Sequence, residues 1–273
     1  MRLLYDVYKG RDRVKAITID NISVNLNGNE VLKNINLSLE EKKFIGIVGP
    51  NGGGKTTLLR AILGFIKPSS GEIRVFGRRP EEVLKSGEIF GYLPQMLKIK
   101  PDFPIRVIDV VMMGRYGKIG TLRWPKEEDK RKTLEYLSMM GIEELKNELF
   151  GNLSGGQQQR ASIARALAGE PRILLLDEPN TGIDVIGQED FYHLLNGLRK
   201  RIDLTIIMAS HDIGTITTYV DEISCLNKTL HYHGNPLGAL NDTILTELYG
   251  KSVDVLKHTD ICEKCERLRR GTQ

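Results

Sequence analysis

One stretch of this sequence strongly constrains the local fold, because an apolar segment, a glycine-rich loop and a second apolar segment follow one another directly. Residues 44–48 predict a buried strand, and residues 57–63 predict a helix that ends at Gly64. The loop between them fits the pattern G-x-x-x-x-G-K-[ST] at every fixed position. It consists of Gly49, Pro50, Asn51, Gly52, Gly53, Gly54, Lys55 and Thr56, and Thr57 follows it. The sequence therefore predicts a strand, loop and helix that together bind a nucleotide.

The residue types in this loop suit a triphosphate. Glycines let many backbone N–H groups approach the phosphates closely, and the positive end of the following helix faces the same charge. Lys55 adds a mobile cation for the β- and γ-phosphate oxygens, and the Thr56 hydroxyl can ligate Mg²⁺. A glycine-rich turn that binds nothing is the competing interpretation, and the flanking strand and helix disfavour it.

Composition sets the broad class. The chain has 273 residues, of which 40% are hydrophobic, so it can bury the core of one large α/β domain. Its formal charge is +4, from 39 basic and 35 acidic residues that are interspersed, which does not call for nucleic acid as a partner. No apolar run approaches the roughly 18 residues that span a bilayer, and the N-terminus lacks the apolar segment of a secretory signal. Three cysteines make no disulfide framework, so we expect a cytoplasmic protein.

Periodicity predicts the order of the remaining elements. Alternating apolar residues on both sides of Asn27-Gly28 predict an antiparallel hairpin within residues 16–39. The pattern turns helical between Pro101 and Asn152, which indicates a helical insertion. Further apolar runs predict buried strands, mostly of a parallel sheet. These runs are residues 173–176, 204–208 and 223–226. A helix that has Ser154 as its N-cap and extends through Leu167 is predicted before the first run, and a helix over residues 188–200 is predicted between the first two runs.

The expected fold is therefore α/β: a mixed, mainly parallel sheet with flanking helices, an N-terminal antiparallel β-subdomain and an inserted α-helical subdomain. We expect an extension over residues 1–15, one domain over residues 16–250 with its helical part at about 96–165, and a tail over residues 251–273.

An acidic pair ends the apolar run 173–176. In open parallel sheets, ligands gather at the carboxyl ends of the strands, which is where Asp177 and Glu178 fall. Asp177 can hold Mg²⁺ opposite Thr56, while Glu178 is free to orient and polarise the water that attacks the γ-phosphate. A helix-capping acidic pair is the alternative.

A second motif points to a family. Leu153 is followed by Ser154, Gly155, Gly156 and Gln157, just upstream of the acidic strand. This run resembles the signature sequence of ATP-binding cassette (ABC) ATPases, whose fold has a phosphate-loop NTPase core. A serine hydroxyl, two glycine N–H groups and a helix N-terminus would form a second anion site. The resemblance implies a head-to-tail homodimer with two ATP molecules between the subunits, each held by one phosphate loop and the opposite signature.

Other positions can be carried over from the same family. The resemblance assigns Gln95 to the Mg²⁺ and water environment, Asp184 to the loop over residues 180–184 that crosses between subunits, and His211 to the switch histidine at the γ-phosphate. It also expects an aromatic residue stacked on adenine where this chain has Leu26, which offers no π-face. Tyr5 and Tyr8 of the N-terminal extension are candidates to replace it.

Two further segments, less specific than the motifs above, indicate a subgroup of this family. Residues 103–116, and residues 224–227 with 231–236, are similar to segments of zinc/manganese-type importer ATPases. That resemblance implies a separate membrane permease docked on residues 96–124, a substrate-binding protein of the same system, and a position on the inner face of the cell membrane. Importers of iron-siderophores and cobalamin share part of the first segment, and an exporter ATPase or a soluble iron–sulfur assembly scaffold also stays open.

The tail carries a C-x-x-C pair four residues after a histidine. His258, Cys262 and Cys265 can serve as three ligands of a tetrahedral Zn²⁺, with His231 or His233 as a fourth if the tail folds back. A solvated tail whose thiols do nothing is the competing interpretation, and the sequence favours it because a single pair is weak evidence.

Overall fold

A six-stranded sheet organises the molecule in the computed structural model. Its strands lie in the order β5-β6-β7-β3-β8-β9, parallel except for the antiparallel pair β8 and β9. Their bounds are β5 Phe90–Leu93, β6 Ile173–Asp177, β7 Thr205–Ser210, β3 Phe44–Val48, β8 Glu222–Asn227 and β9 Thr229–Gly234. Strands β3, β6 and β7 are buried at every residue, which explains their continuous apolar sequences.

A smaller antiparallel sheet lies beside the first one. Its order is β2-β1-β4, with β1 at Lys15–Leu26, β2 at Asn29–Glu40 and β4 at Ser70–Val75. Asn27 and Gly28 connect β1 to β2 with φ values of 50° and 81°. Two successive positive φ angles match the right-handed twist of a two-residue hairpin, which is why Asn-Gly is favoured there. The predicted hairpin is confirmed.

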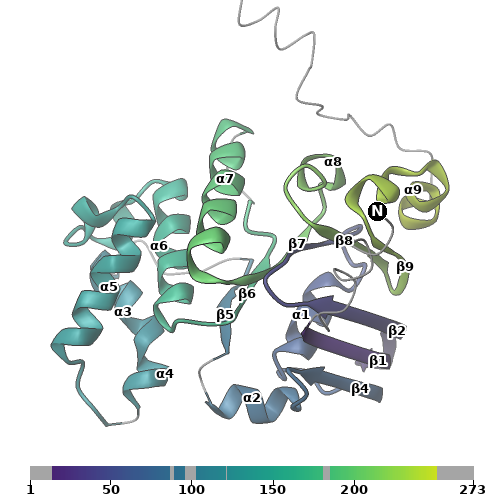
Figure 1. The fold of residues 1–273 in the computed structure, drawn as a ribbon, viewed down its shortest axis with the longest axis horizontal. Helices are drawn as coiled ribbons and strands as arrows, with labels where there is room; N and C mark the ends of the chain where they lie inside the picture. The colour runs from purple at the N-terminus through teal and green to yellow at the C-terminus, as the bar shows by residue number, and fades with distance from the viewer. Residues whose placement is uncertain (1–13, 87–88, 96–102, 121, 181–184, 251–273) are drawn as a thin grey trace, which may run out of the picture.

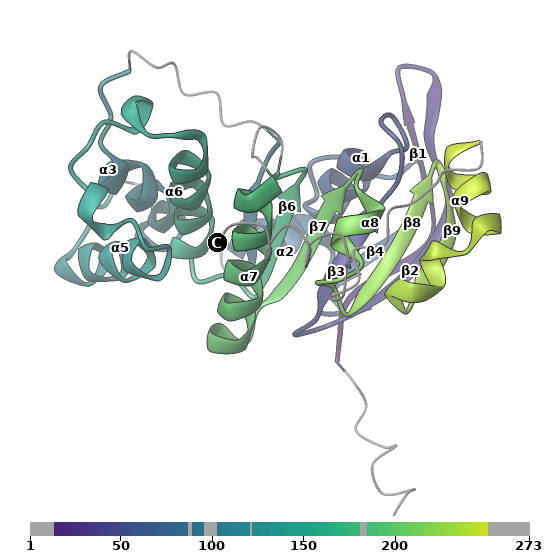
Figure 2. The same cartoon turned by 90° about the horizontal axis from the view of Figure 1, so that it is seen from above.

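Helices α3 to α6 gather at the end of the molecule opposite β1, β2 and β4, with α7 and the larger sheet between them (Figure 1; Figure 2). They occupy the stretch for which the sequence predicts a helical insertion. The α-helices are α1 Lys55–Ile62, α2 Pro80–Ser86, α3 Val107–Met112, α4 Tyr116–Ile119, α5 Glu127–Met139, α6 Gly155–Ala168, α7 Val185–Ile202, α8 Ile213–Ile216 and α9 Asp242–Tyr249. Short 3-10 helices are η1 Met113–Arg115, η2 Glu143–Leu145, η3 Phe150–Asn152 and η4 Pro236–Leu240.

A buried cation ties the helical region together. Arg115 is 5% exposed, and its guanidinium donates to the Asp129 carboxylate at 3.0 Å, to the Ala168 carbonyl at 3.0 Å and to the Glu170 carboxylate at 3.0 Å. Partial burial opposes ionisation of Glu170, but hydrogen bonds from Lys118, Lys132 and Arg115 outweigh it and lower the pKa of that carboxyl to about 2. The ends of α4, α5 and α6 are thereby joined through charged groups.

The structure describes residues 14–86, 89–95, 103–120, 122–180 and 185–250. Several expectations fall outside these ranges: those for Tyr5 and Tyr8, for Asp184, for residues 96–102 of the docking segment, and for the tail with His258, Cys262 and Cys265. Within the described ranges, the helices are all too short or too polar to cross a bilayer.

Candidate nucleotide-binding site

The candidate site lies at one edge of the larger sheet. The carboxyl ends of β3, β5, β6 and β7 all reach this edge, because these strands run parallel. A cavity of about 280 Å³ opens there. Its lining consists of Val31, Asn51, Gly52, Gly54, Lys55, Thr56, Thr57, Gln95 and Glu178. Polar groups from three separate segments of the chain thus line one hollow.

The phosphate loop is shaped by its glycines. Gly52 and Gly54 have φ values of 80° and 95°, in a region that L-residues other than asparagine and aspartate rarely visit. A Cβ on Gly49 would overlap the carbonyl oxygen of Leu226, and one on Gly54 would lie 2.6 Å from a methyl group of Leu32. The loop therefore packs against the two strands beside it so closely that side chains at these positions do not fit.

Lys55 begins α1 and is 4% exposed. Its ammonium donates to the carbonyl oxygens of Gly49 and Pro50, at 2.9 and 3.1 Å, and lies 3.1 Å from the Glu178 carboxylate. A buried ammonium needs such acceptors, because an unpaired buried charge is costly. The same three oxygens hold the cation at the rim of the cavity, where phosphate oxygens can compete for it.

Thr56 and Asp177 meet directly, as the sequence predicts. The Thr56 hydroxyl donates to the Asp177 carboxylate at 2.9 Å, and Asp177 is 1% exposed. Burial raises the pKa of Asp177, an effect that the hydrogen bond from Thr56 opposes. A buried carboxylate beside a hydroxyl is a set of hard oxygen donors, which is what Mg²⁺ prefers. The residues present therefore fit a magnesium ion.

Glu178 stands where the remaining predicted residues converge. The Gln95 amide donates to its carboxylate at 3.1 Å, and Nδ1 of His211 lies 3.7 Å from the same oxygen. The backbone of Glu178 has a φ of 48°, and its N–H donates to the Ala209 carbonyl at 3.0 Å. An L-residue with positive φ costs of order 1 kcal/mol or more, so the surrounding strands must over-determine this placement.

The signature segment stands apart from this cavity. Ser154 caps α6: its hydroxyl accepts from the Gln157 N–H at 3.4 Å, and the Gln157 side chain accepts from the Ser154 N–H at 3.0 Å. The predicted N-cap is confirmed. A Cβ on Gly155 or Gly156 would meet no atom within 4 Å. The packing of the described chain therefore gives no reason for glycine at these two positions.

One link between the signature helix and the acidic strand was missed by sequence reasoning. The Gln159 amide on α6 donates to the Pro179 carbonyl at 2.6 Å, one residue beyond Glu178. Gln159 lies five residues after the signature serine, but the only sequence signal for such a contact is its place on that helix.

Two predicted ligands have other partners. Nδ1 of His231 lies 3.3 Å from the Glu247 carboxylate, and Nδ1 of His233 lies 3.0 Å from the Ser224 hydroxyl. No cluster of three or more His, Cys, Asp or Glu side chains suited to a metal occurs among the described residues. Leu26, at the end of β1, is 36% exposed and pairs with Asn29 across the hairpin. That Leu26 lies beside the adenine base stays a prediction.

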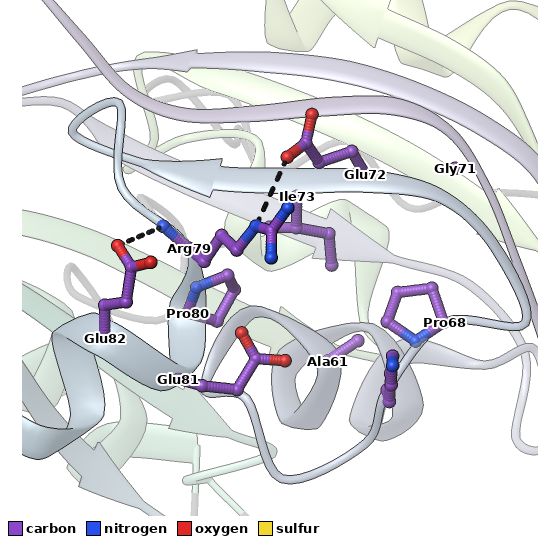
Figure 3. Close-up of a pocket in the computed structure, with 10 residues that line it drawn as sticks. Ala61, Pro68, Gly71, Glu72, Ile73, Arg79, Pro80, Glu81 and Glu82 are labelled. Carbon is purple, nitrogen blue, oxygen red and sulfur yellow. Dashed lines mark hydrogen bonds and ion pairs between the residues drawn. The ribbon is translucent and has the colours of Figure 1, made fainter.

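A second hollow lies away from the phosphate loop, between α1, β4 and α2 (Figure 3). Its volume is about 660 Å³. Carboxylates of Glu72, Glu81 and Glu82 line it, and the Arg79 guanidinium extends to within 3.8 Å of Glu72. Lys67 also lines it, so three carboxylates stand against two cations. The smaller cavity is the better nucleotide site, because the phosphate loop with Lys55 and Thr56 lines it.

Known proteins resemble this chain over most of its length. The chain is 42% identical to a "Probable metal transport system ATP-binding protein" of Thermotoga maritima, over 86% of this chain and 91% of that protein. It is 40% identical to a manganese transport system ATP-binding protein of Synechocystis sp., covering 80% and 84%. A zinc import ATP-binding protein of Pseudomonas fluorescens is 36% identical, covering 88% and 84%.

Solved structures and family models agree with this likeness. A transporter described as metal-chelate type, solved in an inward-facing conformation, superposes with a TM-score of 0.77 and 28% identity, covering 86% of this chain and 89% of that one. The expected α/β fold is thereby confirmed. The model of the ABC transporter family matches residues 32–181, which is more than half of the chain. This chain belongs to the ABC transporter family and is one of its ATP-hydrolysing subunits.

Proposed function

We propose that this chain powers the import of a metal ion, zinc or manganese, by hydrolysing ATP on behalf of a separate membrane permease. The observation that carries the proposal is the likeness to manganese and zinc transport subunits over 80–88% of the chain. The convergence of Lys55, Gln95 and His211 on Glu178 supports the hydrolytic part.

Glu178 is the residue we assign to the attacking water. Its carboxylate is 12% exposed, so it can accept a proton from a water molecule next to the γ-phosphate. The Lys55 ammonium is shared between Glu178 and two loop carbonyls. Phosphate oxygens that draw Lys55 away would make room for a water molecule beside the Glu178 carboxylate.

Mg²⁺ would be held by Thr56 and Asp177, with Gln95 near it, and when bound it would neutralise charge on the phosphates. The role of this chain is to supply an ionised Asp177 in a nearly closed site. Burial disfavours that charge and the hydrogen bond from Thr56 offsets the effect only in part, so a divalent cation would stabilise the ionised carboxylate further.

A homodimer would complete the site. We assign Ser154, Gly155, Gly156 and Gln157 to the phosphates of the ATP that the partner subunit binds, and Asp184 to the contact between subunits. The open space around Gly155 and Gly156 supports this, because small residues allow a close approach from outside the chain.

The permease would dock on the segment over residues 96–124, which would keep the ATPase peripheral on the cytoplasmic face of the membrane. The described part of this segment exposes large apolar side chains at Phe103 (55%), Tyr116 (50%), Leu122 (99%) and Trp124 (89%). Exposed apolar residues gathered in one segment favour a protein interface. A substrate-binding protein would deliver the ion on the other side.

One alternative cargo has support of its own. A solved structure with high similarity is described as a metal-chelate type transporter, which keeps an iron-siderophore or cobalamin as a second candidate. The two can be separated by reconstituting the chain in liposomes with a metal-importer permease and its binding protein. We expect ATP hydrolysis to rise when the binding protein carries Zn²⁺ or Mn²⁺. Stimulation by a ferric siderophore or cobalamin alone would contradict the proposal.

A further inference from the structure

The last described helix, α9, is bonded to the loop that carries His211. Helix α9 packs beside β8 and β9 through buried Leu245 and Leu248 (Figure 1; Figure 2). The Asn241 side chain caps its start, and Gly250 ends it with a φ of 73°. Both ends are therefore fixed, and the last turn holds its side chains in defined positions.

Tyr249, in that last turn, contacts the backbone of His211. Its hydroxyl donates to the His211 carbonyl at 3.3 Å, across 38 residues of sequence. Burial raises the pKa of Tyr249 to about 12, so the phenol stays protonated and remains a donor at neutral pH. The His211 side chain is 61% exposed, so little packs against its ring. Its position relative to Glu178 therefore depends largely on how firmly its own backbone is held.

On one side of His211, Ser210 ends β7 and pairs with Val48 of β3. On the other side the backbone is held by local bonds. Asp212 donates its N–H to the Ser210 hydroxyl at 3.0 Å, and its carboxylate caps α8 by accepting from Thr215. These bonds lie within five residues of sequence. The hydrogen bond from the Tyr249 hydroxyl joins the loop to α9, a helix that is distant in sequence. Such a bond restricts movement of the whole loop, whereas the local bonds set its shape.

The same turn is also connected to the phosphate loop. The Leu248 carbonyl accepts from the Asn227 amide at 2.9 Å. The next residue, Lys228, donates its N–H to the Gly53 carbonyl at 2.9 Å and accepts from the Lys33 N–H at 2.8 Å. The end of α9 is thus bonded on one side to the loop of His211 and on the other, through two residues, to the loop that cradles the phosphates.

We propose that Tyr249 is a positioning residue for His211, holding the histidine loop in register with the phosphate loop through the last turn of α9. The inference rests on the proposed role of His211 at the γ-phosphate. In this arrangement Tyr249 touches no substrate. It lowers the number of conformations available to His211, so that the ring stands beside Glu178 in a larger fraction of molecules.

The test is a double-mutant cycle on the full chain, with steady-state ATP hydrolysis measured over a range of ATP concentrations. Tyr249→Phe removes the hydroxyl and keeps the ring. We expect kcat to fall about threefold to tenfold, the worth of one hydrogen bond, while KM for ATP stays within about twofold. In a His211→Ala background the same change should lower the rate less than about twofold, because the hydroxyl acts through His211.

Tyr232→Phe is the matched control. Its hydroxyl donates to the Asn235 carbonyl at 2.9 Å in the adjacent β9 segment, and it has no contact with His211 among the bonds of the described residues. We expect its kcat to equal that of the wild type, and thermal unfolding of both phenylalanine variants should show that neither is partly unfolded.

The possible results separate the two ideas. A loss on Tyr249→Phe that disappears with His211→Ala supports the positioning role. An unchanged kcat, or an equal loss in both backgrounds, overturns it and leaves the role of His211 intact if His211→Ala is itself impaired. Wild-type hydrolysis by His211→Ala would overturn the role of His211 and the inference with it.

Discussion

The two glycine-rich segments of this protein differ in how far the chain itself accounts for them. In the phosphate loop, Gly49 and Gly54 lie so close to Leu226 and Leu32 that a side chain would not fit. In the signature segment, Gly155 and Gly156 have empty space where a Cβ would be. One set of glycines is required by packing within the subunit, and the other is not.

The two segments are therefore complete to different degrees within one subunit. The phosphate loop has its cation, its hydroxyl and its carboxylates already in mutual contact. The signature has a capped helix that begins in open space. The phosphate loop of a single subunit is therefore a preformed half of the proposed site. The signature segment is the other half, and its open surface would be filled only when a partner subunit approaches.

Replacing the Glu178 carboxylate should separate ATP hydrolysis from dimer assembly. Glu178→Gln should lower ATP hydrolysis about 10²- to 10⁴-fold, since the amide cannot accept the proton of the attacking water. ATP binding should persist through Lys55 and Thr56, so the variant should accumulate as an ATP-bound dimer in size-exclusion chromatography. Hydrolysis near the wild-type rate would remove Glu178 from its assigned role. Lys55→Ala, in contrast, should weaken ATP binding itself.

A bulky cation in the signature segment should instead prevent the dimer from forming while each subunit still binds ATP. Ser154→Arg should leave ATP binding by the monomer unchanged, yet lower hydrolysis more than about tenfold by filling the space proposed for the partner's phosphates. Ser154→Ala is the control, because both changes remove the α6 cap, worth about 1 kcal/mol, and only one adds bulk. In a Glu178→Gln background, ATP-induced dimers that form despite Ser154→Arg would contradict the shared site.

Stability measurements address the glycines directly. Gly49→Ala should lower the free energy of unfolding by about 1–3 kcal/mol, because the loop and Leu226 must move apart. Gly156→Ala should leave it unchanged or raise it by about 0.5–1 kcal/mol, since alanine favours the first turn of α6. Chemical denaturation of both variants checks the contrast. Equal destabilisation would mean that the signature glycines serve the fold of one subunit after all.

The smallest effect concerns the base. If Leu26 lies against adenine, Leu26→Tyr should tighten ATP binding by ~1 kcal/mol, about fivefold in Kd, through stacking. Leu26→Ile is the control for a change of shape without a ring. Calorimetric titration with ATP measures both variants. Unchanged binding, together with weaker binding on deleting residues 1–10, would favour a tyrosine of the N-terminal extension.

Features set by local sequence were the most predictable. The Asn27-Gly28 hairpin and the Ser154 cap follow from the conformations that a few adjacent residues prefer, and both are as expected. The meeting of Thr56 with Asp177 was also predictable, because the carboxyl ends of parallel strands share one edge of a sheet. The α7 helix begins at Val185, three residues before its predicted start, and helix ends are the least certain part of any pattern.

Other contacts between distant segments were not predictable from the pattern. The bonds of Gln159 with Pro179 and of Tyr249 with His211 involve residues outside the motifs, and their side chains meet these partners only after the sheet has formed. Arg115 is a clearer case, because interspersed charges predict a solvated surface. It is buried since carboxylates from two other parts of the helical region surround it.

The strand order has a consequence for synthesis of the chain. Strand β3, which leads into the phosphate loop, has β7 and β8 as its two neighbours, and both begin after residue 200. At translation rates of about 5–20 residues per second, β3 waits on the order of ten to thirty seconds before either neighbour leaves the ribosome. Its five residues are all buried in the finished protein. During that interval they form an apolar segment with both edges unpaired, which is the kind of segment that chaperones bind and that aggregates when they do not.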